Sequence, residues 1–271
     1  MNTKPASALN DKKVFLLDMD GTLYNEERLF PDVGAFLNHL KMKKIGYYFL
    51  TNNSSKSSRD YVEKLNRLGI KATSKQIIIS THIAAHYLTR VYGNRKIYAV
   101  GTRSMVKELA RLGVNVTTEE EPGIAAIVVG NDNELDYRKL TSASRLLTAG
   151  ADFIATNVDK ACPVSFGYVP DCGAICEMLT HATGKKPLYM GKPKAEIVNY
   201  VRDLTKAGGK DVVMVGDRLY TDMLMAVKRN MTSVCLLSGE ATETAISKFP
   251  YTIDYVFKDI SSLLRAMKGK L

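Results

Sequence analysis

Two aspartates, Asp18 and Asp20, stand directly behind the apolar run Val14–Leu17 in the stretch VFLLDMDGTLYN. Burying a bare carboxylate is costly unless a cation or hydrogen-bond donors compensate its charge. A buried strand that runs straight into two acids therefore indicates that something is bound at its end. Carboxylate oxygens are hard donors that suit Mg²⁺, which keeps several waters and takes few protein ligands.

Three further polar clusters occupy comparable places along the chain. They are TNNSS (residues 51–55), GKPK (residues 191–194) and GDRLYTD (residues 216–222). The first and the last directly follow apolar runs, and the second directly precedes a helical pattern. Ligands of open α/β sheets bind outside the carboxyl ends of the strands, so we expect all these clusters to face one crevice.

The chemistry of the clusters fits one task. Asp217 adds a third carboxylate to those of Asp18 and Asp20. Thr51 offers a hydroxyl and backbone N–H groups to an anion, and Lys192 offers a positive charge. Such a set can hold a phosphoryl group and spread the charge of its transition state. The sequence therefore predicts a Mg²⁺-assisted phosphoryl-transfer site.

Two other acidic or phosphate-binding motifs do not match. An EF-hand needs a preceding helix and a glycine at the sixth loop position, whereas Gly21 is fourth from Asp18 and a strand pattern precedes it. A P-loop needs a glycine five residues before Gly191 and Ser or Thr after Lys192, and the chain has neither.

Short apolar runs alternate with helical patterns along the whole chain. The predicted strands are 14–17, 45–50, 97–100, 124–129, 153–155, 212–215, 233–237 and 255–257. The predicted helices are 32–44, 58–68, 103–112, 137–148, 173–183, 195–205 and 221–229. Continuous rather than alternating hydrophobicity favours parallel strands covered on both faces, and the order predicts an α/β fold with a Rossmann-like parallel sheet.

Composition narrows the class of protein. The 271 residues are 45% apolar and 24% charged, as in soluble globular proteins, and no apolar run approaches a membrane span. The four cysteines form no CxxC pair, which favours free thiols in the cytoplasm. The net charge of +10 is scattered rather than gathered in an aromatic-rich basic patch, so it favours anionic small substrates over nucleic acid.

With these four clusters, the sequence resembles the haloacid dehalogenase superfamily of phosphohydrolases. DMDGT matches the first motif of the superfamily, Thr51 the second, Lys192 the third and GDRLYTD the fourth. TNNSS, GDRLYTD and the segment ATNVDKACPVSFGYVPDCGAI are similar to the NagD-like, 4-nitrophenyl phosphatase branch. The resemblance covers nearly the whole chain.

The resemblance implies a role for each motif residue. It makes Asp18 the nucleophile and Asp20 the general acid and base. It also implies that Asp18, the Asp20 carbonyl and Asp217 hold Mg²⁺, with Asp222 supporting the metal shell. The activity that follows is that of a Mg²⁺-dependent phosphomonoesterase acting on small phosphorylated metabolites through an aspartyl-phosphate.

A large α/β cap domain is expected between the second and third motifs. About 140 residues separate Thr51 from Lys192, enough for a domain of its own. We expect the cap to span residues 83–187 and the catalytic core to comprise residues 1–82 and 188–271. The cap contains 12 Lys and Arg against 11 Asp and Glu, so nearly all the positive excess falls on the core.

Some residues keep two interpretations. Asn52 and Asn53 are either turn formers or substrate-positioning residues. Asp171 either caps the following helix or contacts substrate, since the resemblance places its loop over the active site. His82 and His86 are four apart, but Ile83 replaces the glutamate of a zinc-protease HExxH, which favours ordinary helix residues.

Alternatives to a phosphatase also remain. One is a haloacid dehalogenase-fold protein without catalysis that binds or regulates. Others are a phosphotransferase (a mutase) or a dehalogenase of the superfamily, and Asp20 disfavours the dehalogenase because that reaction needs no leaving-group acid. The resemblance also allows a homodimer.

Overall fold

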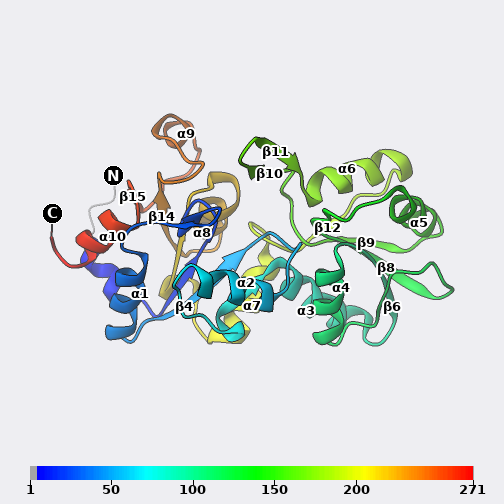
Figure 1. The fold of residues 1–271 in the computed structure, drawn as a ribbon, viewed down its shortest axis with the longest axis horizontal. Coiled ribbons are helices and arrows are strands. Elements are labelled where there is room, and N and C mark those ends of the chain that lie inside the picture. The colour runs from blue at the N-terminus through cyan, green and yellow to red at the C-terminus, as the bar shows by residue number, and fades with distance from the viewer. Residues whose placement is uncertain (1–4, 271) are drawn as a thin grey trace. The chain divides into compact units, whose positions relative to one another are not determined.

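The computed structural model describes residues 5–270, which group into two compact units. The first unit comprises residues 5–50, 62–78 and 201–270, and the second comprises residues 51–61 and 79–200. Each unit carries its own parallel sheet, as the ribbon in Figure 1 shows. The units are described one at a time below.

The sheet of the first unit has six strands in the order β15-β14-β13-β1-β4-β5. The strands are β1 (Val14–Leu17), β4 (Gly46–Thr51), β5 (Ile77–Ile79), β13 (Val212–Gly216), β14 (Thr232–Leu236) and β15 (Tyr255–Phe257). The four pairs from β15 to β4 are parallel. All residues of β1 and β13 are buried, so the continuous apolar runs do mark strands covered on both faces. The predicted α/β fold with a parallel sheet is confirmed.

The chain changes direction across this sheet between β1 and β13. From β1 it passes through α1 (Val33–Met42) to β4 on one side, and from β13 through α8 (Leu224–Lys228) to β14 on the other. Because such crossovers are right-handed, the two helices lie on opposite faces of the sheet. A reversal of this kind opens a crevice at the carboxyl ends of the two central strands.

The second unit is built around a five-stranded sheet in the order β12-β9-β8-β6-β7. Its strands are β6 (Lys96–Val100), β7 (Val116–Thr117), β8 (Ile124–Val129), β9 (Asp152–Ala155) and β12 (Leu188–Tyr189), all paired in parallel. The helices α5 (Tyr137–Thr148) and α6 (Cys172–Thr183) cover one face of the sheet (Figure 1). Their apolar side chains form one core cluster with those of β8 and β9. The helices α3 (Ser80–Tyr92) and α4 (Arg103–Arg111) lie on the other side.

Several elements, most of them short, were not among the strands and helices predicted from the sequence. They are the hairpins β2–β3 (Tyr24–Asn25, Arg28–Leu29) and β10–β11 (Ala161–Val164, Gly167–Pro170), the strands β5, β7 and β12, and the helices α3, α9 (Glu243–Ser247) and α10 (Ile260–Met267). Strands of two or three residues are too short to show a hydrophobic period. The remaining helices, α2 (Ser58–Arg67) and α7 (Ala195–Thr205), lie within a residue of their predicted bounds.

Two findings bear on the environment of the chain. All four cysteines are free thiols, and three of them are buried. Among the helices of residues 5–270, none combines the length and the apolar character that a membrane span requires.

Candidate functional site

Three carboxylates converge beyond the carboxyl ends of β1 and β13 in the first unit. Asp18 follows β1 and donates its backbone N–H to the carbonyl of Val215 at 2.9 Å, which fixes it beside the end of β13. Asp217 follows β13, and Asp222 lies one turn further on. One carboxylate oxygen from each of the three lies within 4.8 Å of the others, and all three residues are buried. The structure therefore brings together the carboxylates of three of the four aspartates predicted to serve a metal, and that of Asp20 is not among them.

Asp217 accepts a hydrogen bond at each of its two carboxylate oxygens. Its Oδ1 accepts a hydrogen bond from Thr22 Oγ1 at 3.1 Å, and its Oδ2 accepts one from the Glu240 N–H at 2.8 Å. Burial, and then the neighbouring Asp222 carboxylate, raise the pKa of Asp217 above its ordinary value. Three buried acids so close together repel one another, and a cation among them removes that repulsion. The donor set fits a hard divalent cation such as Mg²⁺.

Two glycines allow backbone to approach Asp217 closely. Gly21 has φ of +83°, and a Cβ placed on it would lie 2.4 Å from Asp217 Oδ2. A Cβ on Gly239 would lie 1.9 Å from the same oxygen. Gly239 belongs to the loop that follows β14, in which Ser238 Oγ also donates to the Gly21 carbonyl at 2.8 Å. This loop was missed in the sequence because its partner Asp217 lies more than twenty residues upstream, and no local pattern marks the contact.

Replacing Gly239 by alanine should weaken metal binding far more than it weakens the fold. The added Cβ would displace the Asp217 carboxylate, and changes of residues that orient a metal ligand typically cost about 10- to 100-fold in affinity. Calorimetric titration with Mg²⁺ measures this loss. Gly34→Ala is the matched control, because nothing lies within 4 Å of that Cβ position. Equal Mg²⁺ affinities of the two variants would contradict the assignment.

Asp222 is placed by an unusual turn. The helix predicted over residues 221–229 begins with a π-helical turn, Leu219–Met223, that leads into α8. Asp222 Oδ2 accepts the Arg218 N–H at 3.2 Å, and a Cβ on Gly216 would lie 2.4 Å from the same oxygen. Single π-helical turns recur at functional sites because the extra residue redirects a side chain. Here the turn coincides with the acid predicted to support the metal shell.

Asp20 has different surroundings from the three buried acids. Its side chain is 44% exposed. Tyr24 Oη donates to Asp20 Oδ2 at 3.3 Å, and Lys64 Nζ lies 3.5 Å from Asp20 Oδ1. Neither partner was singled out in the sequence. An exposed acid with fixed partners is suited to exchange protons with a substrate rather than to serve as a buried ligand.

The second and third motifs meet inside the second unit through Asn52. The Asn52 Oδ1 accepts the Lys192 N–H at 2.8 Å, and Nδ2 donates to the Lys192 carbonyl at 3.1 Å and to Asp159 Oδ2 at 2.8 Å. Thr51 is the last residue of β4 and immediately precedes Asn52. Lys192 is only 2% exposed. The two residues predicted to bind the phosphoryl oxygens are therefore tied to one another through a single amide.

Asn53 and Asp171 show the contacts of structural residues. Asn53 Oδ1 accepts from Ser55 N at 3.0 Å and from Ser55 Oγ at 2.7 Å, which closes a turn after β4. Asp171 caps the N-terminus of α6 by accepting the Cys172 N–H. These contacts support the turn and cap interpretations. Substrate contact by Asn52, Asn53 or Asp171 stays a prediction.

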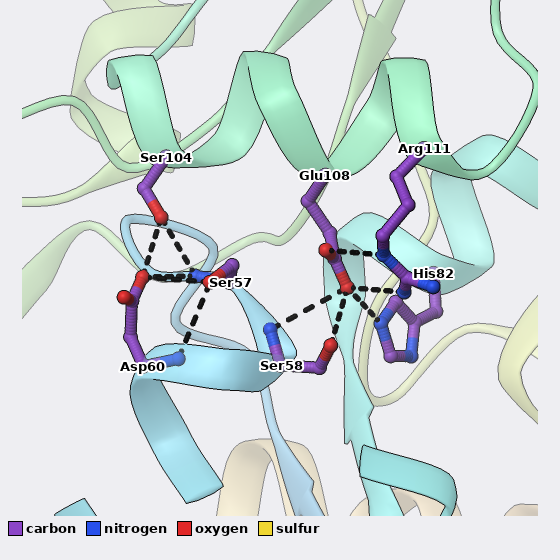
Figure 2. A network of polar contacts seen from close by, with 7 residues as sticks. All are labelled: Ser57, Ser58, Asp60, His82, Ser104, Glu108 and Arg111. Carbon is purple, nitrogen blue, oxygen red and sulfur yellow. Dashed lines mark hydrogen bonds and ion pairs between the residues drawn. The ribbon is translucent and has the colours of Figure 1, made fainter. Parts of the chain in front are cut away.

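A buried polar network anchors the segment that follows Thr51 (Figure 2). Glu108 of α4 accepts hydrogen bonds from Ser58 Oγ at 2.7 Å, from His82 Nε2 at 2.9 Å and from Arg111 at 2.8 Å and 3.0 Å. Burial raises the pKa of the Glu108 carboxyl, but the hydrogen bonds from His82, Arg111 and Ser58 outweigh burial and hold that pKa below its ordinary value. His82 is therefore a helix residue of α3 and a buried partner of Glu108.

A second group of contacts in Figure 2 holds the same segment. Asp60 accepts hydrogen bonds from Ser57 N at 2.8 Å and from Ser104 Oγ, and Ser57 N also donates to Ser104 Oγ at 3.0 Å. Together the two groups attach residues 57–60 to α3 and α4. The loop that begins at Thr51 is in this way an integral part of the second unit.

Replacing Glu108 by glutamine should lower the free energy of unfolding by about 1–3 kcal/mol at neutral pH, because three donors lose a charged acceptor in a buried place. A folded-state pKa below the unfolded one contributes stability above the unfolded value of about 4.3, and that stability is lost as the pH falls. The difference from wild type should therefore shrink under acid conditions. Urea unfolding at several pH values, with the exposed Glu119→Gln as control, measures it. A constant difference across pH would contradict the charged role.

Comparison with known proteins agrees with the geometry. Residues 15–115 match the family model of haloacid dehalogenase-like hydrolases, and residues 189–263 match a second model described as HAD-hydrolase-like. The crystal structure of 4-nitrophenylphosphatase from Thermotoga maritima is 34% identical, covers 96% of this chain and 98% of its own, and superposes with a TM-score of 0.91.

Two other relatives lie in the same group. NagD from Escherichia coli K-12 is 27% identical with a TM-score of 0.84, covering 92% of this chain and 97% of its own. The acid sugar phosphatase of Staphylococcus saprophyticus is 28% identical over 260 residues, which are 96% of this chain and all of the relative. The chain belongs to the haloacid dehalogenase-like hydrolases, in the branch that contains NagD and the 4-nitrophenyl phosphatases.

Proposed function

We propose that this chain is a Mg²⁺-dependent phosphomonoesterase that acts on small phosphorylated metabolites through an aspartyl-phosphate on Asp18. It is a phosphoric monoester hydrolase of its family, as the names of its relatives indicate. The observation that carries the finer proposal is the buried cluster of Asp18, Asp217 and Asp222 beyond the ends of β1 and β13. Three buried carboxylates this close together repel one another, and a bound cation would offset that cost.

The metal would be held by the carboxylates of Asp18 and Asp217 and by the carbonyl of Asp20. Asp222 would support that shell through its contact with the Arg218 backbone. When bound, Mg²⁺ supplies positive charge to the phosphoryl oxygens and to the acids around it. Thr51 and Lys192 would bind the remaining phosphoryl oxygens. The Asn52 amide would fix the backbone of Lys192 through two hydrogen bonds.

The chemical steps are assigned to two aspartates. One Asp18 oxygen attacks phosphorus in line with the departing alkoxide, and the bond from phosphorus to that alkoxide breaks. Asp20 gives its proton to the departing oxygen. Asp20 then takes a proton from water as the water oxygen attacks phosphorus, which releases phosphate and restores Asp18.

The residue ranges of the catalytic core and cap belong to the same proposal. We assign residues 83–187 to a cap that selects the substrate and the flanking segments to the core. Asn52, Asn53 and Asp171 are included as substrate-contacting candidates. Action in the cytoplasm is consistent with four free cysteines.

The deciding experiment is metal-dependent turnover of an aryl phosphate and of a panel of phosphorylated metabolites. Activity should need Mg²⁺ and should be suppressed by an equal concentration of Ca²⁺. Ca²⁺ takes more oxygen ligands at longer distances than Mg²⁺. It would bind both carboxylate oxygens of Asp18, so that neither oxygen could attack phosphorus in line with the departing group. Full activity with excess chelator, or equal activity with Ca²⁺, would refute the metal assignment. No turnover of any phosphate ester would favour a protein that only binds or regulates.

A further inference from the structure

The partners of Asp20 come from two separate elements of the first unit. Tyr24 lies in β2, four residues after Asp20, and the tight backbone turn Met19–Tyr24 brings its hydroxyl to 3.3 Å from Asp20 Oδ2. Lys64 lies forty residues further on, in α2, and its ammonium lies 3.5 Å from Asp20 Oδ1. The two oxygens of one carboxylate thus have different partners.

Lys64 and Tyr24 also contact one another. Lys64 Nζ lies 4.1 Å from the centroid of the Tyr24 ring, within the range of a cation–π interaction. The Lys64 side chain is only 10% exposed and the Tyr24 residue is fully buried. A buried ammonium needs a charged partner, and the carboxylate that lies within ion-pair distance of it is that of Asp20. The lysine is therefore fixed by its own surroundings.

Asp20 needs such fixed partners more than the buried acids do. Its side chain is 44% exposed, so without partners it would sample several rotamers. Transfer of a proton to a departing oxygen requires a particular placement of the donor, and a misplacement of about 1 Å can cost on the order of a hundred-fold in rate. A carboxyl group that acts in both halves of a reaction must return to the same position each time.

We propose that Tyr24 and Lys64 are positioning residues that hold the Asp20 carboxyl for its two proton transfers. Neither gives up or accepts the proton that is transferred. The phenol donates its hydrogen bond to Asp20 and the Lys64 side chain lies against the other oxygen, while the proton moves between Asp20, the departing oxygen and the attacking water. The inference rests on the proposed function, because it assigns helpers to a proton-transfer group.

The test is a double-mutant cycle read with two substrates. Lys64→Met keeps most of the apolar stem and removes the charge, and Tyr24→Phe keeps the ring and removes the hydroxyl. Each should slow formation of the aspartyl-phosphate by about 10- to 100-fold with an alkyl phosphate, measured by rapid quench. With 4-nitrophenyl phosphate, whose leaving group needs no proton, the first step should change by less than about three-fold, far below the value of general acid catalysis.

The Asp20→Asn background separates positioning from a structural effect. In that background neither Lys64→Met nor Tyr24→Phe should slow the first step further, because there is no acid left to position. Mg²⁺ affinity should also stay at the wild-type value in both single variants. Lys71→Met, a change of an exposed lysine in the same unit, serves as the matched control.

Two results would overturn the inference. One is equal slowing with both substrates, and the other is slowing that persists in the Asp20→Asn background. If Lys64→Met does not fold, Tyr24→Phe decides the matter alone, since it removes one oxygen and leaves the ring beneath the ammonium. Failure of the proposed function would look different, because the wild-type protein would then show no Mg²⁺-dependent turnover of either substrate.

Discussion

Asp18→Asn should abolish turnover and leave the fold intact. An amide is a poor nucleophile, so no phosphoryl group can be transferred to residue 18. Phosphate monoesters are among the slowest substrates without catalysis, so the expected loss is many orders of magnitude. The main chain at this position is held by the hydrogen bond from Asp18 N to Val215, which the substitution does not touch.

The same substitution removes one negative charge from the metal cluster. Turnover should therefore be measured at several Mg²⁺ concentrations up to saturation, so that weakened metal binding is not mistaken for a lost nucleophile. Mass spectrometry of the acid-quenched protein should detect phosphorylated wild type and no phosphorylated variant. Asp11→Asn, an exposed change in the same unit, is the control. If the variant retained more than about a tenth of wild-type activity, the substitution would have raised the activation free energy by less than about 1.4 kcal/mol. That is too small an increase for the loss of a nucleophile.

The central elements of the fold could be predicted because their patterns are strong and local. The apolar runs of β1 and β13 are buried throughout, and each is followed at once by an acid of the buried cluster. A strand that ends in a carboxylate is visible in one short stretch of sequence. The convergence of Asp18 and Asp217 then follows from the neighbouring places of their strands in a parallel sheet.

The contacts that orient these acids could not be predicted in the same way. Lys64 contacts Asp20 from a helix position forty-four residues further along the chain, and its place in α2 looks like that of any helical lysine. Position 239 needs glycine because a Cβ there would clash with the Asp217 carboxylate, and no residue near Gly239 in the sequence indicates that contact. Such contacts depend on tertiary packing rather than on the period or composition of a segment.

The burial of Glu108, a charged residue within a helix, also depends on tertiary contacts. The pattern of α4 makes Glu108 look like part of a solvated face, yet the residue is 3% exposed. Its burial is tolerated because Ser58, His82 and Arg111 all donate to it. Those donors come from three separate segments. Only Arg111 belongs to the same helix as Glu108, so a prediction of this site would need the tertiary contacts with Ser58 and His82 first.

Asp20→Asn should separate the two roles of Asp20. General acid catalysis is typically worth about a hundred- to ten-thousand-fold, but only when the leaving group needs a proton. Nitrophenolate departs readily without one, whereas a sugar or glycerol alkoxide does not. The variant should therefore form the aspartyl-phosphate far more slowly from an alkyl phosphate than from 4-nitrophenyl phosphate, relative to wild type in each case.

The second step gives an internal control within the same experiment. Hydrolysis of the aspartyl-phosphate should be slowed equally with both substrates, because the intermediate is the same species and has already lost its leaving group. Rapid-quench measurement of both steps with both substrates tests this. Equal slowing of the first step for the two substrates would mean that Asp20 is not the leaving-group acid. Its pairing with Tyr24 and Lys64 would then serve the local structure, and another group would have to supply the proton.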